Sequence, residues 1–298
     1  MHYEILMKNI QANTFFNVEL KKRAVVSLSK SVDIAVYKLF FMLEISNGNV
    51  TSELKGSIST ISFYHPAQNS LPADLLKQLC IEIEKAGNHP DTSVILLKSE
   101  GERTFCAGAS FDELLQIKTK AGGAEFFSGF ARVINACRKS PKIIIARIQG
   151  KAVGGGVGLA AAADYCLATE AASIKLSELA IGIGPFVISP AVIREIGLPA
   201  FSQLTIRAVD FQTAAWAKEK GLYNEVYPDI TSLDSALDAL AQKLASYHPE
   251  ALHGLKQILW EGTEDWDKLL AERAVISGEL VLSEFTQHAL RGFLGGKR

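Results

Sequence analysis

Between positions 72 and 176, segments whose apolar residues recur with the period of a helix alternate with short segments that are apolar without interruption. After Pro72, five apolar residues recur at helical spacing: Leu75, Leu76, Leu79, Ile83 and Ala86. Pro72 suits the first turn of a helix and Gly87 suits its end, so the pattern predicts a helix over 72–85. Residues 93–98 contain an unbroken apolar run, which predicts a fully buried strand.

The alternation of helix and strand extends in both directions from this pair. Upstream, short strands are separated by the turn residues Asn47-Gly48 and Lys55-Gly56. Downstream, one helix begins in the consecutive glycines 154–156. The remaining predictions are strands at 43–45, 50–54, 57–63, 143–148, 165–168 and 173–176, a loop at 101–108, and helices at 110–117 and 124–139. This order is typical of α/β proteins with a mainly parallel sheet.

The last third of the chain is predicted to be almost entirely helical. Helices are predicted at 189–196, 199–208, 213–220, 232–246, 249–260 and 265–282, with one strand at 224–227. No linker separates this part from the α/β core, so we expect it to pack on the core or on a neighbouring subunit. The sequence thus predicts three parts: an N-terminal extension of unknown role at 1–41, an α/β core at 42–230 and a C-terminal helical subdomain at 231–298.

Composition and charge narrow the class of protein. The 298 residues are 48% hydrophobic and 21% charged, with a formal net charge of −1, which disfavours a partner such as nucleic acid or a membrane surface. Cys80, Cys106, Cys137 and Cys166 lie far apart, so neither a zinc site nor a disulfide framework is predicted. The longest apolar runs are shorter than a membrane span. We therefore expect a cytoplasmic globular protein.

The segment from Ile148 to Asp164 is the first candidate for chemistry. Gly154, Gly155 and Gly156 follow a β-branched run and lead into an Ala- and Leu-rich helix, so unpaired backbone N–H groups are available to an approaching oxygen. A dinucleotide fingerprint would need glycine at 159, which is leucine, and neither a phosphate-loop nor a G-x-S-x-G pattern is present. The alternative is that the glycines only allow close packing.

A second loop of small residues, Phe105 to Ser110, joins a buried strand to the next helix. Its backbone N–H groups are also accessible where a helix begins. Two such loops on neighbouring units can direct two N–H donors at one oxygen. Acyl chemistry needs this arrangement to stabilise a developing oxyanion.

Four motifs in these and later segments resemble the crotonase (enoyl-CoA hydratase/isomerase) superfamily. They are Phe-Cys-Ala-Gly-Ala at 105–109, Gly-Lys-Ala-Val-Gly-Gly-Gly at 150–156, Leu-Ser-Glu at 176–178 and Gly-Leu-Tyr-Asn-Glu-Val at 221–226. The resemblance covers residues 43–298. It implies a ClpP/crotonase-like spiral of β-β-α repeats, a C-terminal helical subdomain that forms trimers or paired trimers, and an acyl-CoA substrate. Coenzyme A would be part of the substrate, and no metal or redox cofactor is implied.

The resemblance also implies roles for individual residues. The oxyanion donors would be the amides of Ala109 and Gly155, and Glu178 would be the general acid and base. Its pKa would be raised by Ile181, Ile183 and Phe186. The expected substrate-binding residues are Ala107, Gly108, Gly154, Gly158 and Lys151. Lys151 would meet a CoA phosphate, although a solvated lysine explains it equally well.

The sequence departs from the family at one catalytic position. Hydratases of this family have two glutamates, and the first of them falls on Gly158. Together with 184–190, this variant resembles bacterial hydratases of 3-methylglutaconyl-CoA in leucine breakdown, and the glycine would leave room for a branched or carboxylated tail. Asp112 and Glu113 are alternatives for a second acid. The open alternatives for function are an enoyl-CoA isomerase, an acyl-CoA decarboxylase and a non-catalytic binding or scaffold subunit.

Overall fold

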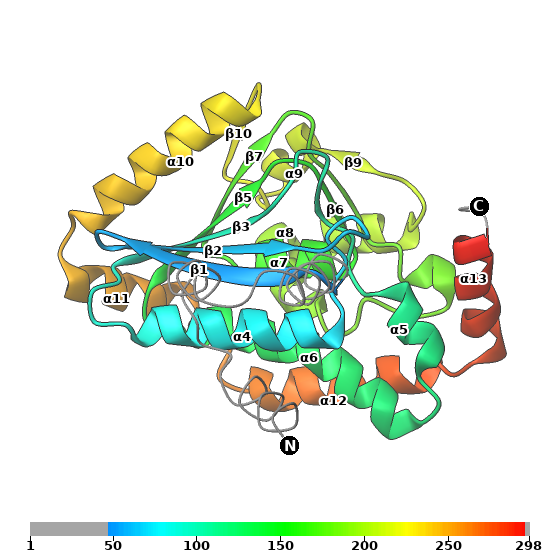
Figure 1. The fold of residues 1–298 in the computed structure, drawn as a ribbon. Helices are drawn as coiled ribbons and strands as arrows, with labels where there is room; N and C mark the ends of the chain where they lie inside the picture. The colour runs from blue at the N-terminus through cyan, green and yellow to red at the C-terminus, as the bar shows by residue number, and fades with distance from the viewer. Residues whose placement is uncertain (1–46, 296–298) are drawn as a thin grey trace, which may run out of the picture. The chain divides into compact units, whose positions relative to one another are not determined.

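The computed structural model describes residues 47–295, and residues 48–295 form one unit (Figure 1). The predicted extension at 1–41 and the predicted strand at 43–45 lie outside the described residues. None of the described helices is long and apolar enough to cross a membrane.

The main sheet has six strands in the order β1-β2-β3-β5-β7-β10. Their bounds are β1 Asn49–Lys55, β2 Ile58–Tyr64, β3 Val94–Ser99, β5 Ile143–Ile148, β7 Tyr165–Thr169 and β10 Glu225–Tyr227. All neighbours are parallel except β1 and β2, which form the predicted hairpin around Gly56. The β-branched run of β5 is buried along its whole length, as a parallel strand covered on both faces requires.

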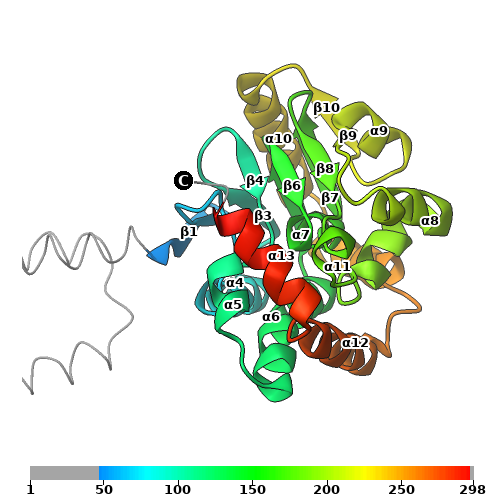
Figure 2. The ribbon, with the colours of Figure 1, turned by 90° about the vertical axis from the view of Figure 1, so that its right-hand side faces the viewer.

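A second sheet has four short strands in the order β4-β6-β8-β9. They are β4 Thr104–Cys106, β6 Lys151–Val153, β8 Ser173–Lys175 and β9 Gln212–Thr213. Strands β4, β6 and β8 each follow a strand of the main sheet, which gives the predicted spiral of β-β-α repeats. Because β4 and β6 are parallel neighbours, the loops that leave their carboxyl ends lie side by side (Figure 2). The sequence prediction treated 101–108 as a loop and missed both strands.

Helices cover both faces of the main sheet. They are α4 Ala73–Asn88, α5 Phe111–Gln116, α6 Lys120–Lys139, α7 Gly155–Ala161, α8 Ser189–Ile206, α9 Ala214–Glu219, α10 Ile230–Ala245, α11 Pro249–Leu259, α12 Trp266–Leu280 and α13 Glu284–Gly295, with a 3-10 turn η1 at Leu179–Ile181. Helices α4 and α6 cover one face and α10 covers the other (Figure 1). Within α8 the backbone of Gly197 is not helical, with a φ of 71° and a ψ of 161°, so the helix is divided there, as the two helices predicted at 189–196 and 199–208 require.

The C-terminal helices pack on the core of their own chain. Leu233, Leu237 and Ala241 of α10 are buried against the main sheet. Helix α12 crosses α6 so closely that a Cβ atom at Gly123 would lie 2.4 Å from the carbonyl oxygen of Gly278. Helix α13, which lies beyond the last helix predicted from the sequence, at 265–282, lies beside α5 and η1 (Figure 2).

A buried ion pair attaches α11 to the sheet. Lys256, only 2% exposed, donates to both carboxylate oxygens of Asp164 at 2.8 and 2.7 Å and to the carbonyl of Cys137 at 2.8 Å. The same carboxylate accepts from the indole of Trp260 at 2.6 Å and from the backbone N–H of Ile144 at 2.7 Å. Each charge is therefore compensated, and removing one partner would leave the other buried and unpaired.

Candidate active site

The loop after β4 presents one unused backbone donor. The carbonyl of Gly108 accepts from the N–H of Leu71 at 2.7 Å, and the N–H of Ser110 donates to the carbonyl of Leu71 at 3.4 Å. The N–H of Ala109, between these two contacts, has no acceptor among the described residues. Gly108 adopts a φ of 84°, a conformation that favours glycine. The loop is thus fixed on both sides of a free N–H.

The glycine run after β6 supplies a second donor and also permits close packing. Gly155 begins α7, and its N–H has no acceptor among the residues that the structure describes. A Cβ atom at Gly155 would lie 2.3 Å from the ring of Phe130, and one at Gly156 would lie 2.4 Å from the carbonyl oxygen of Cys106. The glycine run can therefore act both as a backbone donor and as a site of close packing, because the close packing brings the N–H of Gly155 to the pocket.

The two loops meet in space. A Cβ atom at Gly108 would lie 2.7 Å from the carbonyl oxygen of Val153 and 3.2 Å from the nitrogen of Gly155. Ala109 and Gly155 line the same pocket. The parallel pairing of β4 with β6 produces this proximity, because it aligns the strand ends from which the loops start.

Glu178 faces these loops from the turn that follows β8. A Cβ atom at Gly154 would lie 2.8 Å from Oε1 of Glu178, so the carboxyl group lies directly against the glycine backbone. Its Oε2 is buried and has no hydrogen-bond partner among the described residues, although the residue as a whole is only half-buried. Burial of the carboxyl raises its pKa to about 7. This is the direction that the apolar surroundings predicted.

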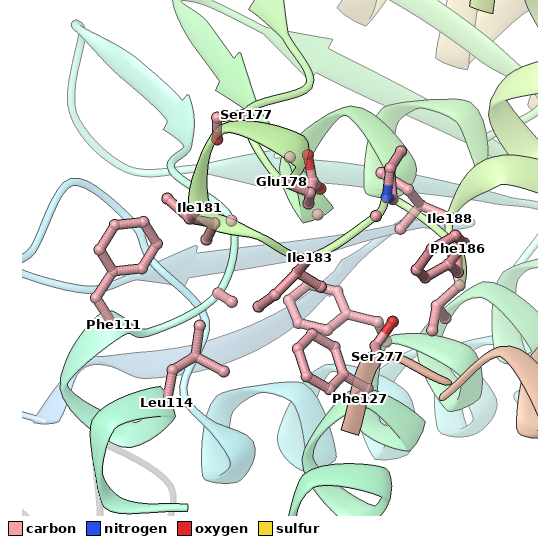
Figure 3. Close-up of a pocket in the computed structure, with 18 of the residues that line it drawn as sticks. Phe111, Leu114, Phe127, Ser177, Glu178, Ile181, Ile183, Phe186, Ile188 and Ser277 are labelled. Atoms are coloured by element: carbon pink, nitrogen blue, oxygen red, sulfur yellow. The ribbon is translucent and has the colours of Figure 1, made fainter. Parts of the chain in front are cut away.

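The two loops and Glu178 line one pocket, which is partly open to solvent. Its lining comes from both loops, from α5 and α6, from residues 177–188 and from α12 (Figure 3). The lining residues are Ala107, Gly108, Ala109, Phe111, Leu114, Phe127, Phe130, Gly154, Gly155, Ser177, Glu178, Ile181, Ile183, Gly184, Pro185, Phe186, Val187, Ile188 and Ser277. Among these, Glu178 alone has an ionisable side chain. The pocket is thus an apolar space with one titrating group beside two free N–H donors.

The expected room at Gly158 is absent, and that prediction is wrong. A Cβ atom at Gly158 would lie 2.3 Å from Cγ2 and 2.6 Å from Cβ of Ile188. Gly158 does not line the pocket, whereas Ile188 does. Helix α7 packs against α8, and the residue that precedes α8 fills the space that the missing side chain leaves.

Lys151 also lies outside the pocket lining. It is exposed on β6, with Nζ 5.1 Å from the centre of the Phe211 ring, and Nζ of Lys175 lies 4.4 Å from the same centre. A contact of Lys151 with a CoA phosphate stays a prediction. Of the other expected substrate-binding residues, Ala107, Gly108 and Gly154 line the pocket.

Neither alternative for a second acid reaches the pocket lining. The Oε2 of Glu113 accepts a hydrogen bond from the backbone N–H of Ala73 at 2.8 Å and so caps the start of α4. Asp112 lies beside it in the first turn of α5. Within residues 47–295, no three His, Cys, Asp or Glu side chains lie together as metal ligands.

The sequence analysis missed the walls contributed by α6, α12 and the residue before α8. Phe127 and Phe130 belong to a helical apolar pattern that equally describes ordinary core residues. Ser277 lies about 100 residues downstream of the Glu178 motif on a helix with no chemical signature. Only the packing of α12 on α6 brings it to the pocket.

Comparison with known proteins places this site in a family. Residues 53–291 match the family model of enoyl-CoA hydratase/isomerase. The chain is 28% identical over 249 residues to the short-chain-enoyl-CoA hydratase of Clostridium acetobutylicum, covering 83% of this chain and 94% of that protein. It is 32% identical over 199 residues to the 2,3-dehydroadipyl-CoA hydratase of Escherichia coli, covering 66% of this chain and 76% of that protein.

Solved structures give the same result for the fold. The crystal structure of an enoyl-CoA hydratase from Bacillus halodurans matches with a TM-score of 0.76 at 22% identity, over 82% of this chain and 99% of that one. An enoyl-CoA hydratase from Mycobacterium avium matches with a TM-score of 0.73 at 26% identity, over 83% and 96%. These matches confirm the crotonase fold. The chain therefore belongs to the crotonase superfamily, as an enzyme of the enoyl-CoA hydratase/isomerase family.

Proposed function

We propose that this enzyme adds water reversibly across the C2–C3 double bond of an enoyl-CoA thioester. The observation that carries the proposal is the Glu178 carboxyl, whose Oε2 has no hydrogen-bond partner among the described residues and whose pKa is raised by burial to about 7, in an apolar pocket beside the two loops with free N–H groups. A group with this pKa is able to accept and to return a proton near neutral pH. Hydration requires both of these transfers.

The proposed mechanism uses three groups. The N–H groups of Ala109 and Gly155 donate to the thioester carbonyl oxygen and stabilise the negative charge that develops there. The Glu178 carboxylate takes a proton from water while the water oxygen forms its bond to C3, and the electrons of the double bond move toward the carbonyl. The protonated Glu178 then returns the proton to C2. The single carboxylate of the pocket thus serves in both transfers.

Two other reactions of the same class fit the same groups. A double-bond isomerase needs one carboxylate to move a proton between carbons, and a decarboxylase needs mainly the oxyanion donors. Either would give a product without a hydroxyl group. A non-catalytic binding or scaffold subunit is a further alternative, but such a subunit has no need of a buried carboxyl with a raised pKa.

The acyl group of the substrate is a separate question. The resemblance around Gly158 favours 3-methylglutaconyl-CoA, and the similar protein of Escherichia coli is named for 2,3-dehydroadipyl-CoA. Both are carboxylated acyl groups. The similar protein of Clostridium acetobutylicum is named for short-chain enoyl-CoA. Since Ile188 fills the space at Gly158, the assignment to 3-methylglutaconyl-CoA now rests on the family resemblance.

A panel of enoyl-CoA substrates tests the proposed reaction. We expect the absorbance of the conjugated thioester to fall on adding enzyme, with the 3-hydroxyacyl-CoA as product by mass spectrometry. A product of unchanged mass would identify an isomerase, and loss of carbon dioxide would identify a decarboxylase. Substrate binding without any turnover would support the scaffold alternative.

We also propose that the protein assembles as a homotrimer or homohexamer through its C-terminal helices, as the resemblance implies. The C-terminal end of the chain carries six apolar residues that suit such an interface: Leu280, Leu282, Phe285, Leu290, Phe293 and Leu294. Leu290 is buried within its own chain, whereas Phe285 and Phe293 on α13 are 66% and 52% exposed; the Leu294 side chain lies outside the described residues. Sedimentation at micromolar concentration should give three or six copies of the 32.3 kDa chain, and a monomer would contradict the proposal.

A further inference from the structure

We infer that the acyl end of the pocket accepts an uncharged hydrocarbon chain and rejects a carboxylated one, with Ile188 as the residue that determines this preference. The inference rests on the proposed function, because it concerns the acyl group of the same thioester. It is carried by the side chains that surround the space next to Glu178. The inference distinguishes the short-chain acyl group for which one similar protein is named from the carboxylated acyl group for which another is named.

The described wall around this space offers no cationic side chain to a carboxylate, and beside Phe127 its polar group is the neutral hydroxyl of Ser277. The apolar side chains of this wall are those of Phe127, Ile183, Phe186 and Ile188, and in Figure 3 Phe186 and Ile188 lie to the right of Glu178. No lysine, arginine or histidine is among the described lining residues. An ionised carboxylate moved from water into such surroundings loses its hydration without gaining an opposite charge.

Glu178 strengthens the discrimination. Its carboxyl is the one titrating group of the described lining, and its pKa is already raised to about 7 by burial. A second carboxylate in the same low-dielectric space would disfavour the ionised form of Glu178 further. The base that the reaction needs would then be protonated at neutral pH.

Ile188 fills the space into which a side chain at the position of Gly158, a glutamate in the two-glutamate pattern, would extend. The side chain of Ile188 is 4% exposed and lies against Gly158, where a Cβ atom would be 2.3 Å from its Cγ2. It replaces a polar group with a branched hydrocarbon wall. In this chain the glycine on α7 and the isoleucine before α8 thus pack against each other and leave no room for a second carboxylate there.

Arg273, on α12, contacts two residues next to Ile188 from outside the pocket. Its guanidinium donates to the carbonyl of Phe186 at 3.4 Å and to the hydroxyl of Ser189. It lines a different cleft, together with Pro190 and Trp266, and is not part of the pocket lining around Glu178. The charge of Arg273 is thus directed at backbone and hydroxyl groups outside the acyl space.

The test compares acyl groups that differ only by a carboxylate. The two pairs are crotonyl-CoA with glutaconyl-CoA, and 3-methylcrotonyl-CoA with 3-methylglutaconyl-CoA. We expect kcat/KM to be at least about 100-fold lower for the carboxylated member of each pair. Equal or higher kcat/KM for the carboxylated members would overturn the inference.

A binding measurement separates this inference from the proposed reaction. Calorimetry with the saturated analogues butyryl-CoA and glutaryl-CoA requires no turnover, and we expect glutaryl-CoA to bind at least about 30-fold more weakly. If neither enoyl pair is hydrated but butyryl-CoA is still preferred, the proposed reaction fails and the inference stands. If glutaryl-CoA binds as tightly as butyryl-CoA, the inference fails whatever the reaction.

Substitution of Ile188 tests the residue itself. Ile188→Lys should raise the kcat/KM ratio of glutaconyl-CoA to crotonyl-CoA at least about 10-fold, whereas Ile188→Met, of similar length but uncharged, should leave the ratio unchanged. An unchanged ratio in a folded Ile188→Lys variant would remove Ile188 from this role. Arg273→Met should not alter the wild-type ratio, and a fall in the use of glutaconyl-CoA would show that Arg273 serves the acyl space.

Discussion

Replacing Glu178 with glutamine is expected to lower kcat for hydration by about 10²- to 10⁴-fold while acyl-CoA affinity stays nearly unchanged. Glutamine keeps the shape of the side chain against Gly154 but cannot accept the proton of the attacking water. The described lining of the pocket contains no other ionisable group to take over the transfer. The measurements are steady-state hydration of crotonyl-CoA and calorimetric binding of butyryl-CoA.

The dependence of kcat/KM on pH tests whether Glu178 acts as the base. Because burial raises the pKa of Glu178 to about 7, the carboxylate that acts as base is scarce below pH 7. For hydration, kcat/KM should therefore rise as pH increases through about 7 and level off above it. In Glu178→Gln, the residual rate should lose this dependence. A wild-type profile that is flat between pH 6 and pH 8 would contradict the assignment of Glu178 as base.

Stability provides the control for the same variant. The raised pKa means that the folded state holds a proton on Glu178 more tightly than the unfolded chain does, so this group opposes folding increasingly as pH rises from about 4.5 to about 7. Glutamine carries no charge at any pH in this range, so it does not oppose folding in this way. The free energy of unfolding of Glu178→Gln at pH 8 should then be no lower than that of the wild type, which separates loss of chemistry from loss of fold.

The repeats of the core were predictable because their strands and helices are long enough to show a period. Strand β5 is six consecutive buried residues, and α4 buries its leucines at helical spacing. Strands β4 and β6 have only three residues each, too few to display any alternation. Their existence depends on pairing with each other and with β8, which is tertiary information. The two loops of the site could therefore be predicted from the sequence, whereas β4 and β6, the strands that align them, could not.

The glycines show where sequence reasoning about a site succeeds and where it fails. Gly154, Gly155 and Gly156 are consecutive, and each is in close contact with a different group, which only bare backbone allows. Gly158, two residues further on, was interpreted by the same logic as open space. A missing side chain indicates that something else lies close, and the sequence does not say whether that neighbour is substrate or protein. Here it is Ile188, thirty residues away in the chain.

Replacing Ala109 with proline is expected to lower kcat by about 10²- to 10³-fold, which corresponds to about 2.7 to 4 kcal/mol of lost transition-state stabilisation. Proline removes the N–H that we assign to the oxyanion, and this N–H has no acceptor among the described residues. The hydrogen bonds on either side, from Leu71 to Gly108 and from Ser110 to Leu71, use other atoms and can persist. The loss should thus appear in turnover and not in the fold.

Two comparisons make the Ala109 experiment decisive. Ala109→Gly keeps the N–H and should retain hydration within about threefold, so a large loss in that variant would point to loop conformation as the cause. Near-ultraviolet circular dichroism and butyryl-CoA binding establish that Ala109→Pro is folded and still recognises the thioester. If the folded proline variant hydrates crotonyl-CoA at the wild-type rate, the carbonyl oxygen does not bind at this loop. The pairing of β4 with β6 would then align the two loops for packing alone.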